Sequence, residues 1–200
     1  MASRLIAGLG NPGPDYSHTR HNLGFRVVER LASAMSARPL DEECHCLLDA
    51  AGELLLCRPQ TYMNRSGWAL RCLAERHGID PASMLVVFDD VALPLGRLRA
   101  RARGGPGGHR GMESVIENLR TEEVPRLRLG IGAGEVDAAQ DLADFVLAPF
   151  TAEERMRVDD LVERAAEAAG VWAVEGIAAV MNRFNAPAPA DGLPGEAGRG

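Results

Sequence analysis

Long apolar runs are missing from this sequence. Near the N-terminus the apolar stretches are short, and Arg4 is the only early charge. A membrane-spanning helix needs about 20 apolar residues, and a signal peptide needs a basic start followed by an apolar core. We therefore expect a soluble, cytoplasmic protein without a signal peptide or a membrane span.

Cysteine pairs at metal-binding spacing are also missing. The four cysteines, Cys44, Cys46, Cys57 and Cys72, include no CxxC pair. A chain of this length does not depend on disulfides for its core, so we expect reduced, structural thiols. The run Cys44-His45-Cys46 is a poor zinc site, because alternate positions on a strand place the two thiols on one face and the imidazole on the other. We therefore expect no metal.

Lysine is absent, and all 22 basic residues are arginine, a choice to which we attach no function. The distribution of charge is more informative than the formal net charge of −6. Residues 97–128 hold eight arginines and four glutamates, whereas 135–200 holds thirteen acidic residues and five arginines. Because the charge is segregated, the negative total does not exclude a polyanionic partner.

Strand-like and helix-like segments alternate along the chain. The apolar patterns predict strands at 4–7, 43–49, 53–58, 84–88, 97–103 and 126–131, and helices at 21–35, 66–77 and 111–119. Thr151 should cap a long acidic helix that breaks or bends at Gly170 and resumes to about Phe184. This alternation predicts an α/β protein with a mixed, twisted sheet flanked by helices.

The length fits one domain better than two. We place this single domain at residues 1–184. The segment 185–200 is rich in proline, alanine and glycine, and we expect it to be a disordered tail.

The segment Gly8-Leu9-Gly10-Asn11-Pro12-Gly13 matches the GxGxxG fingerprint of dinucleotide-binding proteins. In those proteins the loop opens directly into a helix, whereas here prolines restrict the backbone and helical periodicity begins only near His21. A hairpin then follows where a parallel strand ending in an acidic residue is required. We therefore expect no nucleotide cofactor, and a loop that holds Asn11 and Tyr16 at the ligand-binding edge of the sheet.

Polar side chains follow several of the predicted strands: Asn11, Tyr16, His21, Asn64, Asp89, Asp90 and His109. No serine lies in a GxSxG motif, and no cysteine lies near a histidine in a strand-to-helix elbow, so covalent catalysis has no candidate nucleophile. A histidine, a carboxylate and amide side chains suit a hydrolase that activates water. The imidazole takes the proton, the carboxylate holds the other ring nitrogen, and the amides donate to the oxyanion.

Several motifs in order, from about residue 3 to 184, resemble bacterial peptidyl-tRNA hydrolases. They are GLGNPG at 8–13, Tyr16, TRHNLG at 19–24, RPQTYMNRSG at 58–67, Asp89-Asp90 followed by LPLG at 93–96, GGH at 107–109 and RLRLGIG at 126–132. The resemblance implies a single α/β domain that hydrolyses the ester between a peptide and the 3′ end of tRNA. It also implies a monomer that needs no metal, cofactor or obligate protein partner.

The resemblance further implies individual roles. His21 is the catalytic base and Asp89 orients it, while Asn11 and Asn64 position the substrate and stabilise the reacting centre. Three further residues surround the substrate: Met63 lines the site, Tyr16 lies beside the scissile bond, and His109 belongs to a mobile loop over the cleft.

One position departs from the family pattern. Members commonly have Gly-Gly-His-Asn-Gly, whereas this chain has GGHRG at 107–111, with Arg110 in place of the asparagine. Arginine is always charged and cannot accept a hydrogen bond, so it cannot replace an amide that holds the water. Our hypothesis is that Arg110 points outward to a tRNA phosphate and that another group holds the water.

Alternate residues in the segment RLRARAR are arginine: Arg97, Arg99, Arg101 and Arg103. On a strand they would share one face over about 20 Å. They could protect an edge strand from aggregation, or, with the following glycine turn and helix N-terminus, bind an anion. The resemblance implies that Arg101 and Arg128, with Arg99 nearby, hold the tRNA 5′-phosphate.

Two other functions remain open at this stage. A non-catalytic RNA-binding relative would keep the fold and lose the chemistry, and Arg110 is its sequence support. An amidase or esterase for small substrates would keep the chemistry without the arginine strand.

Overall fold

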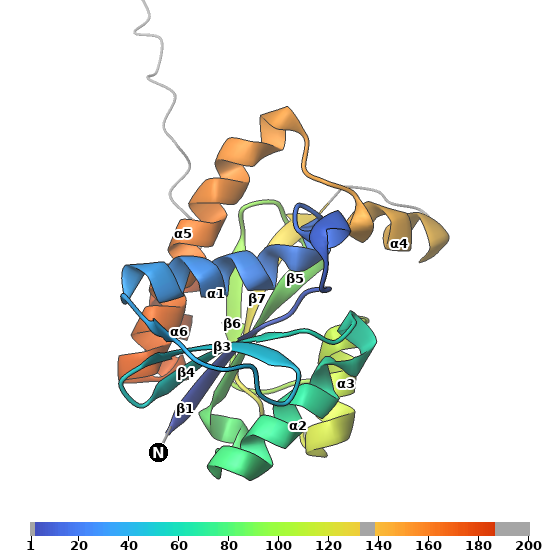
Figure 1. Ribbon diagram of the computed structural model, residues 1–200. Coiled ribbons are helices and arrows are strands. Elements are labelled where there is room, and N and C mark those ends of the chain that lie inside the picture. Colours follow the sequence, from blue (N-terminus) through green and yellow to red (C-terminus); the bar gives the residue numbers. More distant parts are fainter. Residues whose placement is uncertain (1–2, 133–138, 187–200) are drawn as a thin grey trace, which may run out of the picture.

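The computed structural model describes residues 3–132 and 139–186, which form a single α/β domain around a seven-stranded sheet (Figure 1). The strand order is β2-β3-β4-β1-β5-β7-β6. The strands are β1 (Arg4–Gly8), β2 (Arg38–Pro39), β3 (Cys46–Ala51), β4 (Leu54–Pro59), β5 (Met84–Pro94), β6 (Leu98–Arg101) and β7 (Arg126–Gly132). The four central strands β4, β1, β5 and β7 are parallel, and the strands at both edges are antiparallel. The predicted α/β class and mixed sheet are therefore confirmed.

Helices cover both faces of the sheet because its central strands are apolar on both sides. In β1, Leu5 and Ala7 face one helical layer and Ile6 faces the other. The first layer contains α2 (Ser66–His77) and α3 (Arg110–Leu119). The second contains α1 (Leu23–Ala34), α5 (Ala152–Glu175) and α6 (Ile177–Phe184), while α4 (Ala139–Leu147) lies beyond the end of the sheet (Figure 1).

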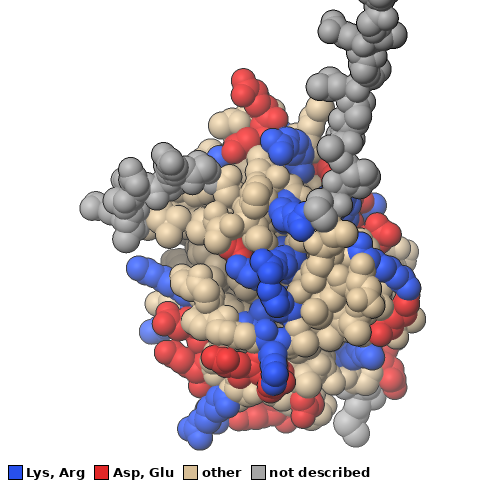
Figure 2. Space-filling view, turned by 180° about the vertical axis from the view of Figure 1, so that it is seen from behind, with Lys and Arg blue, Asp and Glu red and all other residues tan. Residues whose placement is uncertain are grey.

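The side chains of β6 divide between the core and the surface. Leu98 and Ala100 are fully buried against the α5 and α6 side, whereas Arg99 and Arg101 are exposed on the opposite side. Arginine side chains form a band down this face of the molecule (Figure 2). The strand is shorter than predicted, however, because it ends at Arg101 and the chain then turns into the glycine loop.

The long C-terminal helix begins as predicted, and helical structure continues to Phe184 as predicted, but the interruption lies at Gly176 and not at Gly170. Thr151 Oγ1 accepts a hydrogen bond from the backbone N–H of Glu154, whose carboxylate accepts one from the backbone of Thr151 in return. The predicted bend at Gly170 is wrong: the helix runs through it and stops at Gly176, which adopts a φ of 83°. An interior glycine costs a helix only about 1 kcal/mol, whereas a backbone with positive φ cannot continue it.

Asn185, the residue after α6, is hydrogen-bonded to the edge strand β6. Its side chain accepts a hydrogen bond from the Ala100 N–H at 2.6 Å and donates to the Ala100 carbonyl at 3.1 Å, as a neighbouring strand would. The rest of the tail predicted for 185–200, from residue 187 onward, lies outside the described residues. Among the helices that are described, none has both the length and the apolar character needed to cross a membrane.

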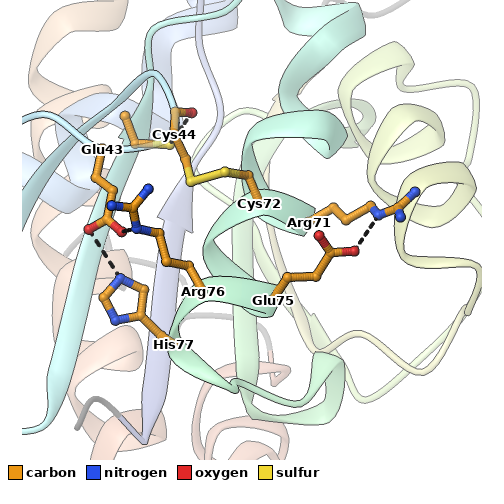
Figure 3. Close-up of a disulfide and its surroundings, with 8 residues drawn as sticks. Glu43, Cys44, Arg71, Cys72, Glu75, Arg76 and His77 are labelled. Atoms are coloured by element: carbon orange, nitrogen blue, oxygen red, sulfur yellow. Dashed lines mark hydrogen bonds and ion pairs between the residues drawn. A yellow bond between two sulfur atoms is a disulfide. The ribbon is translucent and has the colours of Figure 1, made fainter.

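A disulfide joins Cys44, in the turn before β3, to Cys72 in α2, with 5.7 Å between the two Cα atoms (Figure 3). The expectation of four reduced thiols is therefore wrong for this pair, although Cys46 and Cys57 are free and buried. Cys44 and His45 have positive φ angles of 52° and 53°, so they form a turn and not the alternating strand expected. This turn directs Cys44 toward α2, a tertiary contact that the sequence spacing did not reveal.

Ion pairs connect the same two segments beside the disulfide (Figure 3). Glu43 accepts from the guanidinium of Arg76 and lies 3.2 Å from Nε2 of His77, both at the end of α2. The turn before β3 is thus attached to α2 by covalent and ionic contacts together.

We expect the Cys72→Ser variant to be less stable than the oxidised wild type by about 3 kcal/mol, because the disulfide closes a loop in the unfolded chain. The two cysteines are 28 residues apart in sequence. Urea unfolding with and without reductant measures the difference. Reductant should destabilise only the wild type. Equal unfolding midpoints for the oxidised wild type and Cys72→Ser would contradict this prediction.

Candidate active site

A cavity of about 870 Å³ opens where the turns after β1 and β4 and the middle of β5 meet the glycine loop before α3. Nine of the predicted site residues line it: Asn11, His21, Met63, Asn64, Asp89, Arg101, His109, Arg110 and Arg128. Leu142 and Val146 of α4 contribute apolar side chains to the lining. Tyr16 and Arg99 lie outside this lining.

His21 and Asp89 contact each other directly in the cavity. His21 lies in the short 3-10 turn Arg20–Asn22 that leads into α1, and Asp89 lies near the middle of β5. The Nδ1 atom of His21 is 2.8 Å from Oδ1 and 3.0 Å from Oδ2 of Asp89, which is only 1% exposed. Because the carboxylate holds Nδ1 as a donor, Nε2 of His21 is the nitrogen that can accept a proton.

His109 contacts the same carboxylate from the other side. Its Nδ1 accepts a hydrogen bond from the Met112 N–H at 3.1 Å, which caps α3. Its Nε2 lies 3.2 Å from Oδ1 of Asp89 and acts as the donor, since Nδ1 is the acceptor. The sequence predicted His109 in a loop over the cleft, and the structure adds its contact with Asp89.

The two histidines determine the charge of Asp89. Burial by itself raises the pKa of the Asp89 carboxyl group. The positive charge of His21 and the hydrogen bonds from His109 and His21 outweigh that effect and hold the pKa well below its usual range. Asp89 is therefore ionised at neutral pH and suited to stabilise an imidazolium, not to donate a proton.

The same three side chains are also the candidates for holding a metal. One ligand atom from each of His21, Asp89 and His109 lies within 4.8 Å of the others. However, the His21 Nδ1 and His109 Nε2 atoms already hydrogen-bond to Asp89. These hydrogen bonds account for the cluster, and a cation would have to displace them.

Asn11 is fixed by contacts on two sides. Its side-chain oxygen accepts a hydrogen bond from the Met63 N–H at 2.8 Å, so the amide nitrogen of Asn11 is the group available to a substrate. Its backbone N–H donates to Asn22 Oδ1 at 2.8 Å, and Asn22 Nδ2 donates back to the Asn11 carbonyl at 2.9 Å. Asn22, which the sequence analysis did not assign, thus connects the Asn11 loop to the turn that holds His21.

The turn Met63–Arg65 after β4 supplies the floor and one wall of the cavity. Met63 is buried beneath Gly111, where an added Cβ would lie 2.4 Å from the Met63 sulfur. Asn64 is exposed in the cavity wall. Tyr62 also lines the cavity, is 59% exposed and packs edge-on against Tyr16, with ring centroids 6.4 Å apart. Tyr16 therefore borders the site through Tyr62, a residue that the sequence analysis did not select.

Two cross-strand pairs of arginines form the basic face of β6 and β7. Arg99 lies opposite Arg128, and Arg101 lies opposite Arg126, so all four belong to the same side of the sheet. Arg128 is ion-paired with Asp90, which follows Asp89 in β5. Arg128, a candidate phosphate ligand, is thus attached to the residue that directly follows Asp89, the candidate catalytic carboxylate.

The predicted row of four arginines on one strand is wrong at both ends. Arg97 precedes β6 and donates to the backbone carbonyl of Asn185 at 2.7 Å. Arg103 follows β6 and pairs with Glu123 at 3.0 Å on the surface. The strand is too short to present them in line with Arg99 and Arg101, and β7 supplies the other members of the basic face.

Arg110 is the first residue of α3 and is exposed at the cavity wall. It lies between the main cavity and a smaller pocket, and Asn64 lines both with it. Glu113 and Glu117 of the same helix line the smaller pocket. Arg110, at the position where the family pattern has an amide, therefore lines the same two pockets as Asn64.

Known proteins resemble this chain in sequence and in structure over most of its length. The family model described as "Peptidyl-tRNA hydrolase" matches residues 5–191. A peptidyl-tRNA hydrolase of Synechococcus sp. (strain JA-3-3Ab) is 46% identical over 191 residues, covering 92% of this chain and 84% of that protein. One from Methylacidiphilum infernorum is 42% identical over 183 residues, covering 91% and 97%. The crystal structure of peptidyl-tRNA hydrolase from Acinetobacter baumannii superposes with a TM-score of 0.85 at 30% identity, covering 92% and 95%.

Proposed function

Because the chain belongs to the peptidyl-tRNA hydrolase family and hydrolyses the ester bond of peptidyl-tRNA, we propose that His21 is its general base. The observation that supports this role is the contact of His21 Nδ1 with the buried carboxylate of Asp89. That contact fixes the ring and leaves Nε2 free to take a proton from water.

The reaction then proceeds in two steps. His21 Nε2 accepts a proton as water attacks the ester carbonyl, and Asp89 stabilises the imidazolium that forms. When the tetrahedral intermediate collapses, the ribose oxygen leaves and takes the proton from Nε2, giving tRNA and a peptide carboxylic acid that releases its proton to water at neutral pH. The amide nitrogens of Asn11 and Asn64 donate hydrogen bonds to the oxyanion of the tetrahedral intermediate.

We also propose that Arg99, Arg101 and Arg128 bind the 5′-phosphate of the tRNA. Arg99 and Arg128 are cross-strand neighbours, and Arg101 and Arg128 line the cavity that contains His21. Guanidinium groups bind phosphate oxygens in pairs, which fixes orientation as well as charge. Docking of the 5′ end on this face would bring the neighbouring 3′ end of the acceptor stem toward the cavity.

The Arg101→Ala variant should bind tRNA with a weaker dependence on salt. Each phosphate contact that is lost reduces the slope of log affinity against log salt by about 1. Fluorescence titrations at several salt concentrations measure the slope. The matched control is Arg71→Ala, an exposed arginine on α2 that pairs with Glu75 and should leave the slope unchanged. Equal slopes for Arg101→Ala and wild type would remove Arg101 from the phosphate site.

The Arg110→Asn variant tests the departure from the family pattern. If Arg110 binds a tRNA phosphate and another group holds the water, KM should rise by about tenfold, corresponding to about 1.4 kcal/mol, with kcat little changed. Steady-state hydrolysis of N-acetyl-aminoacyl-tRNA measures both constants. A large gain in kcat at unchanged KM would instead show that Arg110 hinders the chemistry and has no binding role.

We further propose that the protein acts as a monomer in the cytoplasm without an obligate protein partner. The resemblance to peptidyl-tRNA hydrolases supports this proposal, and the substrate is a peptidyl-tRNA. Cytoplasmic reductants keep thiols reduced, so in the cytoplasm we expect the protein to lack the Cys44–Cys72 disulfide and to be in its less stable, reduced form. Sedimentation with and without reductant tests the monomer, and a dimer in both conditions would contradict it.

One assay tests the proposed function against its alternatives. The wild type should release N-acetyl-amino acids from tRNA much faster than from a matched ester without tRNA. Binding of tRNA without release would support the RNA-binding relative. Equal release from both substrates would support an esterase for small molecules.

A further inference from the structure

Arg126 occupies a strand position on the basic face, but unlike Arg99 and Arg101 it is buried. It is the first residue of β7 and lies opposite Arg101, yet only 2% of it is exposed. Its guanidinium donates to four backbone carbonyls: Val124 at 3.0 Å, Gly105 at 2.9 Å, Glu122 at 3.0 Å, and Gly104. Arg126 lines the cavity together with Arg101 and Arg128, but these four contacts engage most of its N–H groups with the backbone and leave few for a phosphate.

The four carbonyls belong to the two ends of one segment. Gly104 and Gly105 begin the glycine loop, whereas Glu122 and Val124 lie in the connection from α3 to β7. The backbone N–H of Gly104 also donates to the Glu122 carbonyl at 3.2 Å. A single guanidinium therefore closes the base of segment 104–122, which contains the glycine loop and α3.

The position of this segment matters to the active site. His109 lies within it and contacts Asp89, and Gly111 packs directly on Met63. The loop itself has little intrinsic rigidity, because Gly104, Gly107 and Gly108 adopt φ angles of 144°, 60° and 78°. Glycine samples more backbone conformations than any other residue, so an ordered glycine loop needs an external anchor.

We propose that Arg126 is a positioning residue that holds segment 104–122 on β7, so that His109 meets Asp89, and that it does not bind tRNA. This inference rests on the proposed function of His21 and Asp89. Arginine suits the task because its planar group offers five N–H donors in fixed directions, whereas lysine offers three donors on one atom. Burial lowers the pKa of Arg126, which agrees with a guanidinium withdrawn from water.

The Arg126→Lys variant tests the proposal because it keeps the charge and loses the planar donors. We expect kcat to fall about tenfold, while KM and the salt dependence of tRNA binding stay near wild type. Hydrogen exchange at residues 105–109 should become faster. The matched control is Arg4→Lys, since Arg4 Nη1 donates to the carbonyls of Trp172 and Ala173 at 2.7 Å, outside the cavity. Wild-type kcat for Arg126→Lys, or a reduced salt slope, would overturn the proposal.

A double-mutant cycle separates this role from a general effect on stability. If Arg126 acts through His109, the Arg126→Lys change should cost little further kcat in a His109→Ala protein. Full, independent losses from both changes would overturn the proposal.

A measurement on the wild type keeps the proposal testable if Arg126→Lys does not fold. The NMR signal of the Arg126 Nε–H should exchange slowly and should not shift when a 5′-phosphorylated RNA end is added, whereas the Arg128 signal should shift. A shift of the Arg126 signal as large as that of Arg128 would make it a phosphate ligand.

Failure of the inference and failure of the proposed function give different results. If His21→Ala keeps wild-type turnover, the proposed function is wrong. If His21→Ala is inactive and Arg126→Lys is fully active, only the role of Arg126 is wrong.

Discussion

The His21→Ala variant should hydrolyse N-acetyl-aminoacyl-tRNA about a thousandfold more slowly than the wild type, because it lacks the base that takes the proton of water. KM should change little, since the proposed phosphate contacts lie on β6 and β7 and not on the turn that holds His21. Single-turnover rates at saturating enzyme report the chemical step directly.

A nearby histidine provides the control. His18 precedes His21 by three residues and is exposed. The His18→Ala variant should therefore keep wild-type turnover. If His21→Ala retains more than a tenth of the wild-type rate, another group in the cavity is the base.

The Asp89→Asn variant should also lose about a thousandfold in kcat, although its shape is nearly unchanged. A neutral amide cannot stabilise the imidazolium, and it can present an N–H to His21 Nδ1, which favours the wrong tautomer. Turnover at neutral pH measures this loss. The control is Asp49→Asn, a buried aspartate in β3 that pairs with Arg58. It should affect stability and leave kcat near wild type, and equal kcat losses for the two variants would contradict a specific role for Asp89.

The low pKa of Asp89 also gives a dependence of stability on pH. In the unfolded chain the carboxyl has a pKa of about 3.9, and in the folded protein it lies lower. The Asp89 contribution to the free energy of unfolding is therefore complete above the unfolded value and is lost as pH falls through the folded value. Unfolding in urea between neutral pH and about pH 3 should show a steeper loss for the wild type than for Asp89→Asn, and parallel losses would contradict the lowered pKa.

The sequence predicted those features that depend on local pattern. Alternation of apolar strands with amphipathic helices placed the elements, and the rule that ligands bind at the carboxyl ends of parallel strands placed Asn11 and Asp89 at one edge. The family resemblance added the peptide ester and the functional role of His109. The structure shows that these residues do line one cavity.

The features that the sequence did not predict arise from contacts between distant segments. The Cys44–Cys72 disulfide depends on a left-handed turn whose residues are not glycine. The sequence placed Arg126 on a strand at 126–131 and indicated no role for it, because its contacts with the backbone depend on where Gly104 and Glu122 pass in space. No periodicity in the sequence encodes either contact.

The central claim is that Asp89 acts through His21, and a double-mutant cycle of kcat tests it most directly. The single variants His21→Ala and Asp89→Asn should each lose about a thousandfold, and the double variant should be no slower than the worse of them by more than about threefold. Independent losses that multiply to about a millionfold would show that the two residues act separately, and would contradict the account.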